Sequence, residues 1–241
     1  MTFPVRSSTP GVFSFTLLGV GRCFAVLSFA IVSVAAHAQP AGNTGLNALE
    51  GFVRSTSSGR ATFTQVVTSP ARDGQAAKSK TSSGSFEFLR PNRFKFVYTK
   101  PFEQTIVSDG QTLWLHDVDL NQVTSRKLAQ VMGGTPAAVI ASAADLKALE
   151  ADFTLAPLPD KADKAGVQWI QATPKSKDGQ LQRIAVGLRQ TGKGTELAQL
   201  EILDSFGQNS VMTFSGFEVN PALSAASFSF QPPAGADVVR Q

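Results

Sequence analysis

Apolar and polar residues alternate over most of the chain, and turn residues divide the alternation into short segments. Side chains of a β-strand point to opposite faces in turn, so the pattern predicts strands with one apolar face. Asp109-Gly110 is the clearest signal for a hairpin turn. The predicted strands comprise residues 60–69, 78–89, 93–99, 104–107, 112–117, 122–127, 152–156, 167–172, 181–188, 196–203, 208–217 and a last piece near 228–230.

Two stretches change to helical spacing. Near residues 44–56, a capping Asn43 or Thr44 precedes apolar residues at Leu46, Leu49, Phe52 and Val53. Near residues 135–150, Thr135 can cap a helix, Pro136 fits its first position, and helically spaced apolar residues follow at Val139, Ile140, Leu146 and Leu149. We therefore expect a mainly β (α+β) fold in a single domain: an unclosed antiparallel β-barrel of about eleven strands, with these helices as a lid over its mouth.

Phenylalanines gather around Arg90-Pro91. Alternation puts Phe86, Phe88 and Arg90 on one face of a strand, and Phe94 and Phe96 on one face of the next. A guanidinium cannot easily lose its charge and needs acceptors for five donors, so it suits the closed rim of a cavity better than an ordinary core. The placement of Arg90 suggests an aromatic cavity for an apolar ligand, whereas composition alone favours a plain packed β core.

The first residues have the pattern of a secretory signal peptide. Arg6 and Arg22 precede an apolar run from Phe24 to Ala36, and Ala36-His37-Ala38 fits a cleavage site. We expect residues 1–38 to be removed and residues 39–241 to form the mature domain in the periplasm; an uncleaved membrane anchor is the alternative. Cleavage would remove the single cysteine, Cys23, and leave 20 basic against 18 acidic residues, a net charge of +2 that is too mild to indicate nucleic-acid binding.

Catalytic chemistry has little support in the sequence. The mature chain has one histidine, His116, beside Asp117 and Asp119. These residues allow a metal or general-base site, but a short solvated turn is the alternative, because there is no second imidazole nearby. The chain has no G-x-S-x-G, Walker, dinucleotide-binding or H-E-x-x-H motif. We expect no enzyme activity, no cofactor and no metal.

Beyond these patterns, the chain resembles the LolA family of periplasmic outer-membrane lipoprotein carriers over nearly the whole mature region. The resemblance is carried, in order, by Phe63-Thr64-Gln65, Gly84 with Phe86, Arg90-Pro91-Asn92 with Phe94 and Phe96, Pro101, Ser108-Asp109-Gly110 with Thr112-Leu113-Trp114, Gly134-Thr135-Pro136 with Ile140, Thr173-Pro174-Lys175, and Phe228 to Pro232-Pro233 with Gly235. Each piece is weak alone, but the shared order and spacing are specific.

The resemblance implies an unclosed barrel with an apolar inner face and a helical lid. It implies acylated lipoproteins as cargo, received from an inner-membrane lipoprotein-releasing ABC transporter and delivered to an outer-membrane lipoprotein receptor, with the carrier acting as a monomer. A soluble carrier of another lipid or glycolipid, or a periplasmic lipoprotein sensor with the same fold, is the alternative. The receptor that shares this barrel would need a lipobox cysteine where Gln39 stands.

The resemblance also assigns roles to residues. Arg90 matches an arginine that bonds lid carbonyls and keeps the lid closed; an exposed hairpin arginine is the alternative. The implied acyl-chain cavity comprises Phe63, Phe86, Phe88, Phe94, Phe96, Ile106, Trp114, Val139 and Ile140, although Ala137 and Ala138 are smaller than the family residues at those positions. Arg93, Phe94 and Lys95 form the expected partner-docking rim, with a solvated hairpin face as the alternative.

Overall fold

The computed structural model describes residues 44–71, 74–131, 140–141, 145–158, 161, 166–177 and 179–241. These residues belong to one compact unit. The expected signal peptide, residues 1–38, lies outside the described residues, as do Val139 and the predicted helix start at Thr135.

Among the described residues, a single twelve-stranded sheet forms most of the fold, in the order β12-β6-β5-β4-β3-β2-β1-β11-β10-β9-β8-β7. Neighbouring strands are antiparallel, except that β12 runs parallel to β6. The strands are β1 (Ser58–Ser69), β2 (Lys78–Leu89), β3 (Arg93–Lys100), β4 (Gln104–Asp109), β5 (Thr112–Asp117), β6 (Gln122–Lys127), β7 (Phe153–Pro157), β8 (Val167–Pro174), β9 (Leu181–Thr191), β10 (Gly194–Asp204), β11 (Asn209–Val219) and β12 (Asp237–Arg240).

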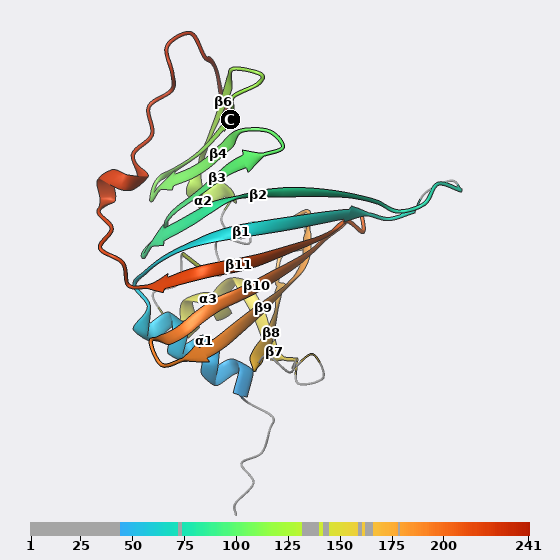
Figure 1. Ribbon diagram of the computed structural model, residues 1–241, viewed down its shortest axis with the longest axis vertical. Helices are drawn as coiled ribbons and strands as arrows, with labels where there is room; N and C mark the ends of the chain where they lie inside the picture. Colours follow the sequence, from blue (N-terminus) through green and yellow to red (C-terminus); the bar gives the residue numbers. More distant parts are fainter. Residues whose placement is uncertain are drawn as a thin grey trace, which may run out of the picture. The chain divides into compact units, whose positions relative to one another are not determined.

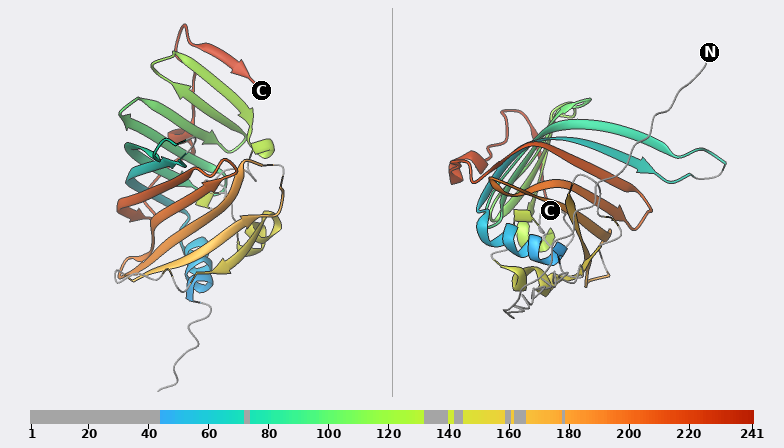
Figure 2. Two further views of the ribbon diagram at one scale, coloured as in Figure 1. Left: turned by 90° about the vertical axis from the view of Figure 1, so that its right-hand side faces the viewer. Right: turned by 60° about the horizontal axis from the view of Figure 1, so that its bottom comes forward.

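The sheet curves strongly but leaves β12 and β7 as separate edges, so the barrel is unclosed (Figure 1, Figure 2). Helices α1 (Thr44–Ser55) and α3 (Leu146–Asp152) lie on the concave side, and α1 contacts β7, β8, β9 and β10. The predicted mainly β fold is confirmed.

The helices form where apolar spacing and capping agree. Helix α1 buries Leu49, Phe52 and Val53 against the sheet, as their spacing predicts. The Asp145 carboxylate accepts a hydrogen bond from the backbone N–H of Ala148 and so caps α3, which begins well after the predicted Thr135. A short helix that the pattern did not predict, α2 (Leu128–Val131), follows β6.

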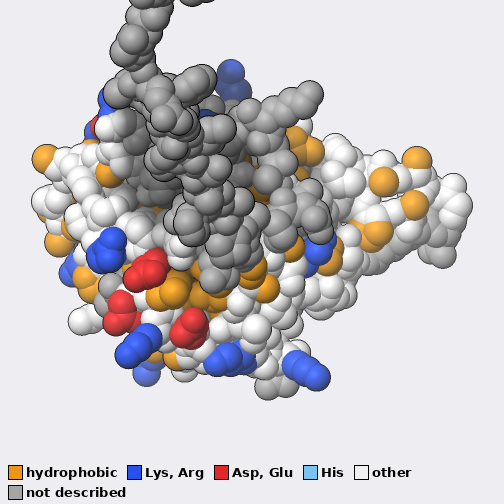
Figure 3. Space-filling view, turned by 90° about the horizontal axis from the view of Figure 1, so that it is seen from below, with side chains coloured by type: hydrophobic (Ala, Val, Ile, Leu, Met, Phe, Trp, Pro, Cys, Tyr) orange, Lys and Arg blue, Asp and Glu red, His pale blue; other side chains and the backbone are white. Residues whose placement is uncertain are grey.

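The outward surface of the helices is mixed in charge. The groove between α1 and α3 is lined by Glu50, Val53, Arg54, Asp145, Leu146, Lys147 and Glu150. Figure 3 views the molecule from the side that carries these helices and shows hydrophobic side chains between acidic and basic ones. The helices therefore bury their apolar faces and present a charged outer surface.

The C-terminal region differs from the prediction. The predicted strand near residues 228–230 is wrong, because Ala225–Phe228 forms a short 3-10 helix, η5, against β3 and β4. Phe228 is fully buried there. The last strand is instead β12, paired with β6. Pro232 and Pro233 lie between η5 and β12, and proline cannot donate a backbone hydrogen bond to a sheet ladder.

Candidate functional site

Five phenylalanines from the first three strands meet on the concave face. Phe63 lies on β1, Phe86 and Phe88 on β2, and Phe94 and Phe96 on β3, and all five are buried. The rings of Phe86 and Phe96 stack with centroids 4.5 Å apart, and the rings of Phe63 and Phe96 meet edge to face at 5.9 Å. Strand pairing explains the cluster, because Phe86 is the partner of Phe96 and Phe88 the partner of Phe94.

Beside this cluster lies an apolar cavity of about 250 Å³. Of the predicted cavity residues, Phe94, Phe96 and Ile106 line it directly, whereas Phe63, Phe86 and Phe88 belong to the packed cluster next to it. The wall is completed by residues that the sequence analysis did not assign to the cavity: Gln65, Tyr98, Leu113, Leu115, Leu200, Ile202 and Met212. Alternation places Leu113 and Leu115 on one face of their strand, but the sequence does not say whether that face is the concave one.

Trp114 lies on the other face of the sheet, which corrects the expectation that it lines the cavity. Its neighbours Leu113 and Leu115 line the cavity, and alternation directs Trp114 away from it. The indole packs against Phe230 with ring centroids 5.6 Å apart, and its Nε1–H donates to Asp109 Oδ2 at 3.4 Å. Trp114 therefore helps to bind the C-terminal segment to the outer face.

Arg90 joins the end of β2 to the helices on the concave side. Its Nε donates to the carbonyl of Ile140 at 3.0 Å. Its Nη1 donates to the carbonyls of Phe52, at 3.3 Å, and of Val53, at 3.4 Å, and also to the carbonyl of Thr56. A cation at the C-terminal end of α1 is favoured by the helix dipole. A single side chain thus bridges α1 and the segment at Ile140.

The surroundings of the Arg90 guanidinium are otherwise apolar. Its central carbon lies 4.9 Å from the ring centre of Phe52 and 5.1 Å from that of Phe88. Burial lowers the pKa of Arg90 to about 10, which still leaves the group charged at neutral pH. Its Nη2 is buried and has no hydrogen-bond partner within the described residues. Arg90 is therefore held by carbonyl groups and aromatic rings, and no carboxylate of the described residues pairs with it.

The segment around residue 140 is bound to the same corner. Ile140 and Ala141 are both buried, and the carbonyl of Ala141 accepts the backbone N–H of Asn92 at 2.8 Å. The resemblance paired Ile140 with Val139 as lid residues; the structure brings Ile140 to Arg90, and Val139 lies outside the described residues.

The three residues of the expected docking rim do not share one face. Phe94 points into the cavity, whereas Lys95 lies on the outer face, where its Nζ is 2.9 Å from Glu87 Oε2 and donates to the carbonyl of Ser227 at 3.0 Å. Arg93 lies on the same face as Lys95. It donates a 3.5 Å hydrogen bond to the carbonyl of Pro91, and its charge helps to lower the pKa of the Asp109 carboxyl. Strand alternation separates these neighbours and corrects the expectation of a single rim.

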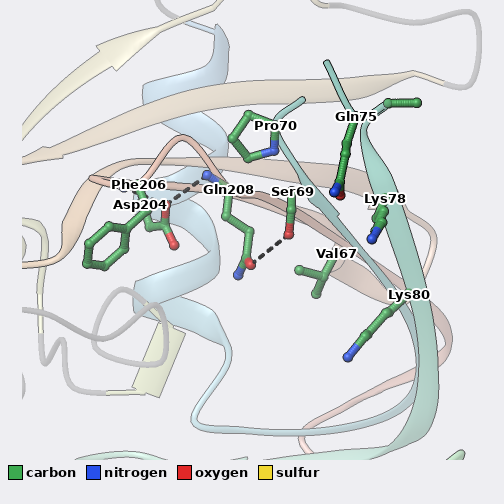
Figure 4. Close-up of a pocket in the computed structure, with 10 residues that line it drawn as sticks. Val67, Ser69, Pro70, Gln75, Lys78, Lys80, Asp204, Phe206 and Gln208 are labelled. Atoms are coloured by element: carbon green, nitrogen blue, oxygen red, sulfur yellow. Dashed lines mark hydrogen bonds between the residues drawn. The ribbon is translucent and has the colours of Figure 1, made fainter. Parts of the chain in front are cut away.

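Two grooves continue the concave surface beyond the cavity. One, of about 480 Å³, is lined by residues that include Gln65, Ser82, Tyr98, Phe102 and Gln104. The other, of about 530 Å³, runs along the extended β1–β2 hairpin, where Lys78 and Lys80 line it together with Val67, Ser69 and Gln208 (Figure 4). The concave face therefore changes along its length. The apolar cavity adjoins a groove that Glu103, Asp117 and Asp119 also line, and the hairpin groove carries Lys78 and Lys80 together with Asp204.

The described residues offer neither a metal cluster nor a helix suited to cross a membrane. No group of three or more histidine, cysteine, aspartate or glutamate side chains is placed there to hold a metal ion. His116 packs instead beside Phe230, with ring centroids 5.9 Å apart. Within the same residues no helix has the length and apolar character needed to cross a membrane.

Comparison with known proteins agrees with this geometry. Residues 54–231 match the family described as outer membrane lipoprotein carrier protein LolA. A protein of Albidiferax ferrireducens named outer-membrane lipoprotein carrier protein is 66% identical over 213 residues, covering 88% of this chain and 99% of its own length. One of the same name from Leptothrix cholodnii is 56% identical and covers 82% of this chain and 86% of its own length.

Solved structures are more distant in sequence. A crystal structure of a LolA superfamily protein from Nitrosomonas europaea has 13% sequence identity and a TM-score of 0.43, and covers 77% of this chain and 97% of its own. The assignment therefore depends on the sequence family and on the close relatives. The match over most of the chain, together with these identities, shows that the chain belongs to the LolA family of outer-membrane lipoprotein carrier proteins.

Proposed function

We propose that this protein is a periplasmic chaperone that binds the acyl chains of lipoproteins released from the inner membrane and transfers them to an outer-membrane receptor. The observation that supports this most directly is the apolar cavity on the concave face of an unclosed sheet, next to helices held by Arg90. The family is a carrier family, not an enzyme family. An ABC transporter would supply the cargo and a receptor lipoprotein would accept it.

The size of the cavity supports a carrier whose helices move when cargo binds. Its volume of about 250 Å³ equals that of about eight water molecules, at about 30 Å³ each. A methylene group is about as large as a water molecule, and three long acyl chains contain many more than eight of them. In this proposal the structure is the closed form, and cargo enters when the helices separate from the sheet.

Reversible binding requires that the closed, cargo-free protein be stable enough to compete with the loaded one. Each buried methylene contributes about 0.8 kcal/mol, so full burial of three acyl chains would exceed the ceiling of useful affinity, about 18 to 21 kcal/mol. Opening the Arg90 contacts subtracts from this gain, and each charge-assisted hydrogen bond is worth about 1.5 to 3 kcal/mol. Arg90 would thus act as the lid-closing residue and keep the affinity low enough for delivery.

The test is a comparison of acylated and non-acylated cargo. The full chain is expressed with its N-terminal segment, and the secreted protein is mixed with a detergent-solubilised triacylated lipoprotein or with its non-acylated twin. Detergent is then removed, and complexes are separated by size-exclusion chromatography. A soluble stoichiometric complex with the acylated form alone is expected. If neither form binds, or both bind equally, acyl-chain binding is excluded.

A further inference from the structure

Two polar side chains stand at the boundary of the apolar cavity. Gln65 on β1 and Tyr98 on β3 line the cavity, and both also line the adjoining polar groove with Ser82 and Gln104. The other cavity-lining residues are apolar. A ligand that extends from the cavity into this groove must therefore pass Gln65 and Tyr98.

Tyr98 reaches this boundary because the strand beside it carries a glycine. Phe63 on β1 and Tyr98 on β3 are both cross-strand partners of Gly84 on β2. The Tyr98 ring lies across Gly84 and meets the Phe63 ring edge to face, with centroids 5.0 Å apart. A side chain at position 84 is excluded, because its Cβ would lie 1.9 Å from the carbonyl oxygen of Val97.

The hydroxyl of Tyr98 is available as a donor. Its ring is packed, but the structure gives the hydroxyl no hydrogen bond to another described residue. Burial raises the pKa of Tyr98 to about 12, so the phenol keeps its proton at any physiological pH. Tyr98 is only partly buried, so its hydroxyl can exchange a water molecule for a ligand acceptor, and a carbonyl bound there would keep a hydrogen bond after leaving water.

Gln65 offers a second donor in a fixed place. Its Nε2 donates to Ser210 Oγ at 2.7 Å, and Ser210 is itself buried. An amide nitrogen carries two hydrogens, so this bond holds the side chain and leaves one hydrogen for another acceptor. Both residues therefore present donors where the lining changes from apolar to polar.

The chemistry of a lipidated cysteine fits this arrangement. Its acyl chains are apolar, but each is joined to the rest of the molecule through an ester or amide carbonyl. That carbonyl must leave water when its chain is buried, which is unfavourable unless a donor replaces the lost hydrogen bonds. We propose that Tyr98 and Gln65 form a polar collar, donating hydrogen bonds to the linkage carbonyls of bound acyl chains and thereby setting how deeply the chains enter.

This inference rests on the proposed function, and it predicts how the bound lipoprotein is oriented in the cavity. The chain ends would point toward the phenylalanine cluster near Arg90, and the linkage would lie at Gln65 and Tyr98. The peptide would then leave along the polar groove, toward the surface on which Lys78 and Lys80 lie (Figure 4).

The test compares two synthetic probes that differ only in the linkage oxygens. One is a tripalmitoylated cysteinyl hexapeptide with ester bonds, and the other is its analogue with ether bonds in place of both esters. Their affinities for the secreted protein are measured by competition with a fluorescent fatty acid. The wild-type protein should bind the ester probe about five- to tenfold more tightly, the effect of about one hydrogen bond to a desolvated acceptor.

Variants assign this preference to the collar. Tyr98→Phe keeps the ring and Gln65→Met keeps the length, and each should weaken binding of the ester probe several-fold while changing that of the ether probe less than about twofold. Gln199→Met is the control, because Gln199 is half-buried in the same sheet but lines neither the cavity nor the groove. Circular dichroism and thermal unfolding verify that each variant is folded.

The outcomes separate the collar from the carrier function. If the wild-type protein binds both probes equally, or if Tyr98→Phe and Gln65→Met leave the ester preference unchanged, the collar is overturned and acyl-chain binding stands. If neither probe binds, the proposed function itself fails. An ester preference that Tyr98→Phe removes and Gln199→Met retains supports the collar.

Discussion

Arg90 illustrates how one residue can link elements that are far apart in sequence. Its acceptors are carbonyls at the end of α1 and at Ile140, and these need a planar group with several donors. We expect Arg90→Leu to accept acylated cargo but to transfer it to the receptor at least about tenfold more slowly, because the closed state no longer competes with the loaded one. Transfer is measured in a reconstituted assay with purified receptor.

Arg183→Leu serves as the matched control for this prediction. Arg183 is exposed on β9 and is not among the residues expected to dock a partner. Its loss should leave transfer within about twofold of wild type. Normal transfer by Arg90→Leu, or an equal loss in both variants, would contradict the assigned role of Arg90.

Tyr98 gives a direct optical measure of burial at the cavity boundary. It is the single tyrosine of the chain, so absorbance of the phenolate reports this residue alone. The folded protein should titrate near pH 12, and the unfolded protein near the ordinary pKa of about 10. Because the folded pKa is the higher one, this group's contribution to stability is complete below about pH 10 and is lost as the pH rises toward 12. A folded-state titration near 10 would exclude the burial described.

At the scale of elements, β2 depends on a close approach to β3. The pairing shifts in register between Ser83 and Gly84, where the backbone of Val97 leaves no room for a Cβ. We expect Gly84→Ala to lower the free energy of unfolding by about 3 kcal/mol, because strand backbones cannot move apart without loss of the ladder. Urea unfolding at neutral pH measures this change.

Gly51 in α1 provides the opposite case. A Cβ there would meet nothing closer than Thr195 Oγ1 at 3.8 Å, an ordinary contact. Alanine is preferred over glycine inside a helix, so Gly51→Ala should raise the free energy of unfolding by about 0.5 to 1 kcal/mol. If Gly51→Ala also lowered the free energy of unfolding, the loss in Gly84→Ala could not be assigned to the close packing at Gly84.

The strand pattern was largely readable from sequence, and its failures have physical causes. The predicted segments 78–89, 112–117 and 122–127 coincide with β2, β5 and β6, because turn residues bound each of them. Strand β12 was missed because it has only two apolar residues, Val238 and Val239, and gains its ladder from a distant partner, β6. Phe228 and Phe230 were predicted to lie in a strand because a buried segment that covers a sheet is as rich in apolar residues as a strand is.

Assignment of faces was harder than assignment of strands. Leu113 and Leu115 alternate with Trp114 and His116, so both faces of β5 carry large side chains and the pattern does not say which is concave. The face of Lys95 could be predicted, because its alternation with Phe94 and Phe96 places it on the face opposite to these two phenylalanines. Its contact with Ser227 and its position 5.8 Å from the Phe228 ring centre depend on tertiary structure and could not be predicted from local sequence.

At the scale of the molecule, the sheet is covered on both sides. Helices and the phenylalanine cluster occupy the concave side, while the segment around η5 covers the outer side of β3 and β4. Removal of the fully buried ring in Phe228→Ala should lower the free energy of unfolding by about 3 to 5 kcal/mol. Phe102→Ala is the control, since Phe102 is 68% exposed and its loss should change stability by less than about 0.5 kcal/mol. Equal denaturation midpoints for the two variants would show that the outer layer adds little.

The extended hairpin leaves part of one strand without a neighbour. Within the described chain, β3 pairs with β2 only from Ser83 onward, so residues 78–82 expose one row of backbone donors and acceptors. Lys78 and Lys80 lie on this row, and lysines on a free edge oppose the addition of a second copy. These two charges would therefore oppose self-association of the protein through this edge. Replacing both by threonine should cause concentration-dependent growth in light scattering, and high salt should produce part of the same growth in the wild-type protein.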